Sequence, residues 1–167
     1  MAVRVVVENS LTRRAMAGVS RREIQRRATA MMALLQLDKS EFSLALSDDE
    51  QIRKLNKIYR GKDRPTDVLA FAMREGDFGA LAGELLGDVI VSLPTATRQA
   101  KERNVDLLDE VTMLVAHGLL HLLGWDHDTA AKDRAMRSET QRLCVAAAVA
   151  PRRKLRRSRQ RREAAPR

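Results

Sequence analysis

All three histidines of the chain lie within the eleven residues HGLLHLLGWDH, as His117, His121 and His127. The first two are four residues apart, so on a helix their imidazoles lie on one face, about one turn apart. Gly124 is placed to end that helix, because glycine readily adopts the left-handed conformation of a helix end. The chain can then turn back and bring His127 to the other two. Three neutral imidazoles in this pattern predict a site for Zn²⁺ or a similar divalent metal.

The ligand types favour an open, catalytic site over a closed, structural one. Structural zinc sites have four protein ligands and are usually rich in cysteine. Cys144 is the only thiol, and it falls in a separate predicted helix. Asp126 or Asp128 could supply a fourth ligand or cap the next helix, and Asp126 could instead support the ring of His127 from behind. We therefore expect one Zn²⁺ per chain, held by three histidines and water.

The spacing HxxxHxxGxxH also occurs in zinc peptidases of the metzincin type. Those enzymes need a glutamate directly after the first histidine, as the general base for the metal-bound water. Gly118 occupies that position and cannot accept a proton. The missing base argues against a metallopeptidase.

The elements that must position these histidines alternate between strand and helix patterns. Strands are predicted over residues 3–9, 42–47, 68–73 and 85–92 from their apolar alternation. Five helices are predicted from capping and periodicity signals: 20–37, one that begins after Asp48 or Asp49, 94–103, 107–123 and 129–148. About four strands and five helices indicate a single layered domain of the α+β or α/β class. The order of the strands does not follow from the sequence.

Most of the net charge of +9 belongs to the C-terminal end. Residues 151–167 hold nine Lys and Arg against one Glu, a net +8, which leaves +1 for residues 1–150. We expect a domain over 1–150 and a basic, disordered tail over 151–167. The tail would either attract polyanions such as RNA or only keep the protein in solution. Its candidate RNA contacts are Arg152, Arg153, Lys154, Arg156 and Arg157.

The remaining composition indicates a cytoplasmic protein. One cysteine excludes an intramolecular disulfide framework. No stretch approaches the roughly 18 apolar residues of a membrane span, and the N-terminus lacks a cleavable leader pattern. We expect no membrane association. Only five aromatic residues occur, which argues against an RNA platform that stacks bases on rings.

Three blocks in order resemble the YbeY family of bacterial endoribonucleases, also called rRNA maturation factors. They are LNKIYRGKDRPTDVLAF (55–71), LLGDVIVS (85–92) and HGLLHLLGWDH (117–127). The resemblance runs from about Phe42 to His127. It implies an α+β fold: a single compact domain with a small mixed sheet and a central helix that carries the first two histidines. The family commonly has VLSFP where this chain has VLAFA, with Ala70 and Ala72.

The resemblance implies a zinc-dependent endoribonuclease specific for single-stranded RNA. Its expected roles are 3′ end maturation of small-subunit rRNA and ribosome quality control, with the small ribosomal subunit and its assembly proteins as partners. The alternative from another class is a non-catalytic, metal-containing ribosome-assembly factor. The lack of an obvious proton acceptor favours that alternative, since Glu110 lies two turns before His117 and is too distant.

Arg60 matches the arginine of the YRGKD block and is the candidate catalytic and RNA-binding residue. A guanidinium can grip a phosphate with two hydrogen bonds and offset its developing charge. From the residues alone, a surface arginine at a helix end is the alternative. Asp88 matches the aspartate of the family's GD strand and could orient a neighbour or contact a partner. Thr66 and Asp67 belong to a predicted turn and could also line the cleft.

Overall fold

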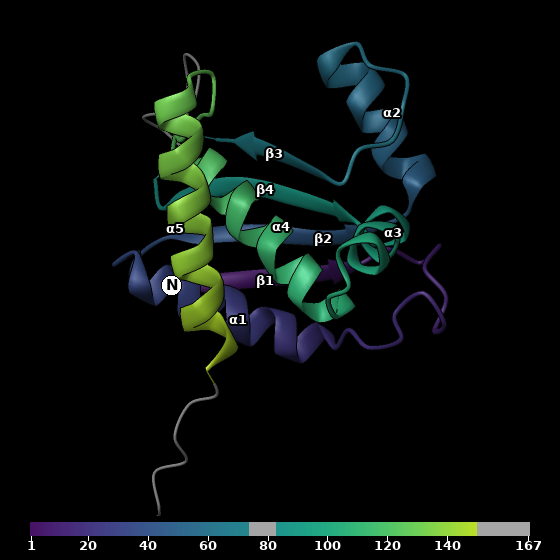
Figure 1. Cartoon of the computed structure of the whole chain (residues 1–167), viewed down its shortest axis with the longest axis horizontal. Coiled ribbons are helices and arrows are strands. Elements are labelled where there is room, and N and C mark those ends of the chain that lie inside the picture. Colours follow the sequence, from purple (N-terminus) through teal and green to yellow (C-terminus); the bar gives the residue numbers. More distant parts are fainter. Residues whose placement is uncertain (74–82, 150–167) are drawn as a thin grey trace, which may run out of the picture.

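The computed structural model describes residues 1–73 and 83–149. Four strands form one mixed sheet in the order β1-β2-β4-β3. β1, β2 and β4 run parallel, and β3 runs antiparallel to β4 (Figure 1). This order places β4 beside β2, from which it is separated by a helix and β3 in the sequence. The bounds are β1 Ala2–Val7, β2 Glu41–Ser47, β3 Val68–Ala72 and β4 Leu85–Ser92.

Five helices complete a single α+β domain, as the sequence predicts (Figure 1). α4 is central: it packs on β3 and β4 and also contacts α1, α3 and α5. α1 covers β1 and packs against both α4 and α5. One face of the sheet, the inner face, is therefore covered by helices. The bounds are α1 Arg21–Leu34, α2 Asp49–Arg60, α3 Leu93–Arg103, α4 Leu107–Leu122 and α5 Ala130–Ala148.

The apolar run from Leu107 explains why α4 lies in the core. Ten of its sixteen residues are buried, so it is apolar on more than one side and must be enclosed. Gly118 faces the sheet, where an added Cβ would lie 2.6 Å from a methyl group of Val89. The missing side chain thus lets α4 approach β4 closely, at the helical turn that carries the first histidine.

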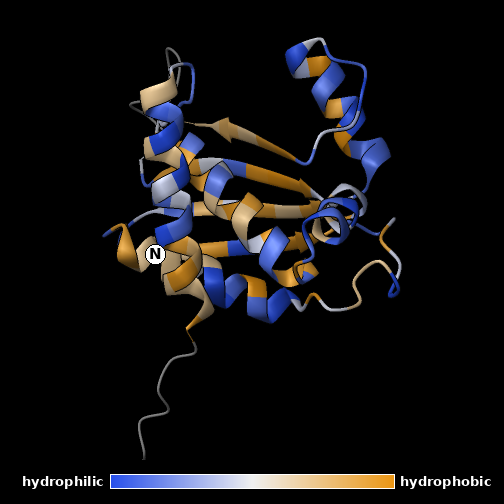
Figure 2. Ribbon diagram, in the orientation of Figure 1, coloured by the Kyte–Doolittle hydropathy of each residue, from blue (hydrophilic) through white to orange (hydrophobic). Residues whose placement is uncertain are grey.

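The other face of the sheet, the outer face, is only partly covered. Register pairs Arg4 with Ser43, Ser43 with Asp88 and Asp88 with Phe71, so these four side chains form a row across that face. α2 contacts β3 and β4. It is mainly hydrophilic, as Figure 2 shows. The outer face keeps polar groups that the inner face excludes.

Most predicted boundaries agree with the structure to within one or two residues. Ser20 and Asp48 each cap a helix by accepting a hydrogen bond from a backbone N–H. α1 ends at Leu34, three residues early, because Gln36 adopts a left-handed conformation with φ of 57°. β1 covers 2–7 and not 3–9, since the chain turns at residue 9. The basic tail, residues 151–167, lies outside the described residues.

Candidate metal centre and cleft

The three histidines meet in space. Each offers one ring nitrogen, and these three atoms lie within 4.8 Å of one another. The Nε2 atoms of His117 and His121 are 3.0 Å apart. Two nitrogens bound at about 2.1 Å to one tetrahedral ion would be separated by about 3.4 Å. The donor set therefore fits a divalent metal after small side-chain adjustments.

The end of α4 brings the third histidine to the other two. α4 stops at Leu122, and Gly124 follows with φ of 85°. The Gly124 N–H donates to the carbonyl of His121, and the Trp125 N–H donates to the carbonyl of Leu120. These bonds satisfy two carbonyls of the last helical turn, and the chain reverses there. His127 is the most exposed of the three and closes the triad from outside the helix.

The surroundings keep the ring nitrogens available as ligands. Burial, together with the neighbouring His121 and His127, lowers the pKa of His117 from 6.5 to about 4. Burial also lowers the pKa of His121, with a contribution from the positive charge of Arg60. Both rings are consequently neutral at pH 7, the state in which an imidazole can bind a metal.

Arg60 shares a cleft with the triad although it comes much earlier in the sequence. The cleft has a volume of about 570 Å³. Arg60 is the last residue of α2, and its side chain makes no hydrogen bond or ion pair within residues 1–73 and 83–149. An exposed guanidinium beside three histidine rings can receive an anion. The cleft is lined by Tyr59, Arg60, Thr66, Asp67, Val68, Leu69, Ala70, Phe71, His117, Gly118, His121 and His127.

Asp67 is the only carboxylate among the described residues that line the cleft. The backbone N–H of Val68 donates to its Oδ1 at 2.8 Å, and Gln99 Nε2 donates to its Oδ2 at 3.2 Å. These bonds fix the carboxylate at the wall of the cleft. From the sequence, Asp67 is expected first in a turn and second at the cleft. Gln99 was missed, because nothing in a helical sequence marks a glutamine that supports a distant loop.

Two other candidate residues lie away from the ligand nitrogens. Asp126 is exposed and binds Lys132, whose Nζ is 3.2 Å from its carboxylate. No hydrogen bond joins Asp126 to a histidine ring in the described part of the chain. Asp88 lies on the outer face of the sheet, where it lines a second hollow of about 570 Å³ with Arg4 and Phe71. It therefore faces away from the triad, as a residue for contacting a partner would.

Glu110 is buried and paired with Arg103 at 3.2 Å, near the start of α4. It does not line the cleft, which agrees with its exclusion as a proton acceptor.

No helix within the described ranges combines the length and the apolar character needed to cross a bilayer.

Comparison with known proteins agrees with this geometry. The family model described as Endoribonuclease YbeY matches residues 8–147. A protein named Endoribonuclease YbeY from Geobacter sulfurreducens is 40% identical over 123 residues, which cover 74% of this chain and 82% of the relative. One of the same name from Aquifex aeolicus is 44% identical over 115 residues, covering 69% and 75%.

A solved structure supports the fold alone. The solution structure of a Thermotoga maritima protein superposes with a TM-score of 0.54 at 23% identity, over 87% of this chain and 88% of that chain. The residues that the family model matches include β2–β4, α2 and the whole triad. This chain belongs to the endoribonuclease YbeY family.

Proposed function

We propose that the protein is a zinc-dependent endoribonuclease that cleaves single-stranded RNA. The observation that carries this proposal is the cleft in which Arg60, unpaired within the described residues, meets the three histidines. A phosphodiester needs a cation for its charge and a means of activating the attacking oxygen, and the cleft provides the residues for both. The name of the family supports RNA as the substrate.

Each residue of the cleft has a defined part in this proposal. His117, His121 and His127 would hold a divalent ion, which would supply Lewis acidity. Arg60 donates hydrogen bonds to the non-bridging phosphate oxygens and offsets the charge that develops on them. Asp67 accepts the proton of the attacking hydroxyl while the new P–O bond forms and the bond to the leaving ribose oxygen breaks. The leaving oxygen takes a proton from solvent.

Nitrogen-only ligation is the reason for proposing zinc. Imidazole suits zinc and other late transition metals, whereas magnesium and calcium prefer oxygen ligands. Three protein ligands leave one tetrahedral position open, which is the arrangement of catalytic zinc sites.

The biological role that we propose is maturation of the 3′ end of small-subunit rRNA and ribosome quality control, in the cytoplasm. The small ribosomal subunit and its assembly proteins would then be the partners. The outer face supports a protein contact, because Asp88 and Arg4 are accessible there beside apolar side chains. The basic residues 151–167 would add sequence-independent attraction to rRNA.

Cleavage assays with matched arginine variants test this function. Protein loaded with one equivalent of zinc is incubated with single-stranded RNA, with duplex RNA and with casein, each with and without chelator. We expect cleavage of single-stranded RNA alone, lost on chelation. Arg60→Ala should lose most of the cleavage but keep the metal. Arg53→Ala is the control, because Arg53 is exposed on the same helix, pairs with Asp63 and does not line the cleft.

Two outcomes would contradict the proposal. Stoichiometric zinc without RNA cleavage would favour a non-catalytic assembly factor that uses the ion for stability. Full cleavage by Arg60→Ala would show that this arginine is an ordinary surface residue.

A further inference from the structure

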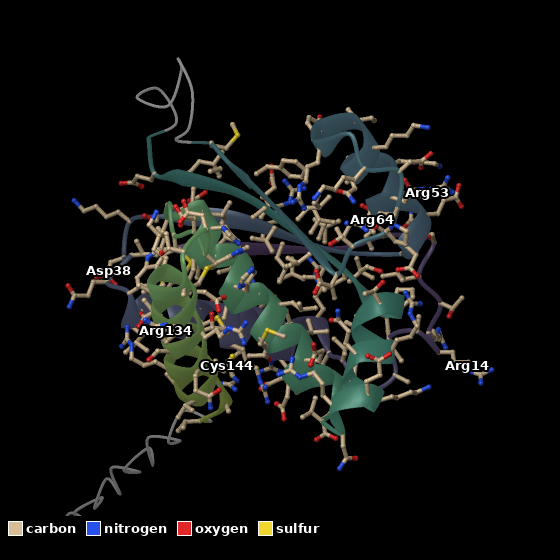
Figure 3. The ribbon with its side chains drawn as sticks, turned by 45° about the horizontal axis from the view of Figure 1, so that its top comes forward. Arg14, Asp38, Arg53, Arg64, Arg134 and Cys144 are labelled. Carbon is tan, nitrogen blue, oxygen red and sulfur yellow. The ribbon has the colours of Figure 1, made fainter. Side chains whose placement is uncertain are left out.

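A second hollow adjoins the triad on its other side. This hollow, which we call the α4–α5 groove, lies between α4 and α5 and has a volume of about 660 Å³. Its walls include Met113, Cys144 and Gln141 (Figure 3 labels Cys144 on α5). His117 and His127 line both the groove and the cleft described above. The triad therefore separates two hollows, each large enough for part of a substrate.

The two hollows differ in how their arginines are paired. In the cleft, Arg60 has no partner in the described part of the chain. At the groove, Arg137 pairs with Asp133 at 2.9 Å, and Arg103 pairs with the buried Glu110 at 3.2 Å. Each groove cation is thus already matched by a carboxylate. A phosphate has a free cation to bind in the cleft but none in the groove.

Apart from its arginine–carboxylate pairs, the surface of the groove suits a flat, neutral group with a polar edge. Burial raises the pKa of the Cys144 thiol to about 11, so the thiol is neutral at pH 7 and packs beside Met113 as an apolar surface. Gln141 is exposed, and its amide makes no hydrogen bond with the described residues. The Thr140 hydroxyl in the same wall is buried and also lacks a partner among them. A buried hydroxyl without a partner costs free energy, which a polar ligand edge would relieve.

We propose that the α4–α5 groove receives the unstacked base of the nucleotide next to the scissile phosphate. This inference rests on the proposed RNA cleavage and adds a base-binding subsite to it. The charged cleft takes the phosphate, the triad lies at the bond to be broken, and the neighbouring base enters the groove. Gln141 presents a donor and an acceptor to the edge of that base, while Met113 and Cys144 contact its face.

The subsite gives single-strand preference a physical cause. A base in a duplex is stacked and paired, so filling the groove would require extruding it at a cost of a few kcal/mol. A base in a single strand is free to turn out and expose its edge. The groove contributes binding free energy only when such a base is available.

The first experiment uses Cys144 as a reporter, since it is the only cysteine. Zinc-loaded full-length protein is alkylated with iodoacetamide near pH 9, alone or with a bound 2′-O-methyl oligonucleotide, whose intactness after the reaction is checked on a denaturing gel. Binding of the strand is followed separately by fluorescence anisotropy. A series of strands carries one abasic residue at successive positions. This readout does not depend on catalysis.

We expect the intact strand to slow alkylation of Cys144 by about tenfold or more, since a bound base excludes solvent from the thiol. An abasic residue at one position should restore the rate of the free protein while the strand stays bound. If Cys144 is alkylated as fast with the intact strand bound as without it, the subsite proposal is wrong. The proposed function is not contradicted by that result. Failure of every strand to bind overturns both.

The second experiment removes the polar contact to the base. Gln141→Ala is compared with Arg142→Ala, a neighbouring exposed change whose side chain pairs with Glu139 and does not line the groove. Substrates that differ only in the base beside the cut are compared by kcat/KM. Loss of one neutral hydrogen bond should lower kcat/KM for the substrate with the preferred base by about fivefold. We expect this loss in the Gln141 variant alone. An unchanged base preference in Gln141→Ala overturns the assignment of that residue.

Discussion

Helix α4 buries ten of its sixteen residues and carries two of the histidines, whereas α2 buries two of its twelve and carries Arg60. Both helices contribute to one cleft, but they are attached to the domain in different ways. The position of α4 is set by close packing on the sheet and on α1 and α5. Packing of this kind is rigid, because interiors are filled to the density of organic crystals.

α2 is attached mainly by polar contacts. Asp49 accepts hydrogen bonds from Ser92 and Thr95, each at 2.6 Å, and from Arg98 at 2.9 Å. Nearer the cleft, Asn56 donates to the carbonyl of Arg64 at 2.8 Å. The comparison teaches that the metal ligands are positioned by the core, while the arginine is positioned by a few hydrogen bonds. The two halves of the cleft should therefore be separable by mutation.

The largest expected difference between the two helices is in the unfolding free energy that is lost when one large aliphatic side chain on each is truncated to alanine. Leu119→Ala on α4 removes a fully buried side chain and should cost about 2–5 kcal/mol of unfolding free energy. Ile58→Ala on α2 removes a side chain that is 71% exposed and should change it by less than about 0.5 kcal/mol. Urea denaturation measures both. Similar losses in the two variants would mean that the helices are anchored alike.

Asp49→Ala should damage the arginine half of the cleft and spare the metal half. Burial alone would raise the pKa of Asp49, but hydrogen bonds from Ser92, Thr95 and Arg98 lower it. Losing them should cost about 1–3 kcal/mol and loosen α2 over the sheet. RNA cleavage should fall while zinc content stays at one equivalent, as elemental analysis would show. Loss of zinc along with cleavage would argue that the two halves are coupled.

Acid should lower the unfolding free energy of the metal-free protein, because His117 in the metal half of the cleft binds a proton more readily in the unfolded chain. The pKa of His117 in the folded protein is about 4, below its ordinary 6.5, so the unfolded chain binds more protons between those values. Stability is then full above pH 6.5 and is lost as the pH falls toward 4. After allowance for solvent screening of this half-buried ring, the loss is about 1–2 kcal/mol. Denaturation of chelated protein at several pH values measures it, and His117→Asn should flatten the profile.

The smallest effect on the fold is expected from removing residues 151–167. We expect unchanged unfolding free energy and metal content, because the described residues that line the cleft all precede the tail. Binding to single-stranded RNA should weaken and become less steeply dependent on salt, since fewer counterions are released. Titrations of full-length and truncated protein at several salt concentrations provide the comparison. If truncation abolishes metal binding, the expected domain boundary near residue 150 is wrong.

Local signals account for what could be predicted from the sequence. Ser20, Pro94 and Gly124 determine helix starts and ends through their own backbone and side-chain preferences, so their neighbours suffice. The two histidines four apart and the third beyond a glycine are equally local. The triad was therefore predictable without knowledge of the rest of the fold.

Long-range pairing accounts for what could not be predicted. β4 lies between β2 and β3, an order that depends on contacts between distant segments. The meeting of Arg60 with His121 depends on that order and on the contacts of α2 with β3 and β4. From the sequence alone, only the family resemblance suggested it. The α4–α5 groove had no local signal, since Met113, Gln141 and Cys144 look like ordinary helix residues.

The order of the strands and the metal ligands along the chain has a consequence for synthesis. Every strand of the described sheet lies within the first 92 residues, and the first histidine of the triad is residue 117. A growing chain emerges N-terminus first, so the strands and Arg60 are made before any of the three ligands exists. Until residue 127 has been added, the nascent chain lacks the full donor set for the ion. A prematurely terminated chain that stops short of residue 117 is therefore born without this metal centre, whatever part of the sheet it has assembled.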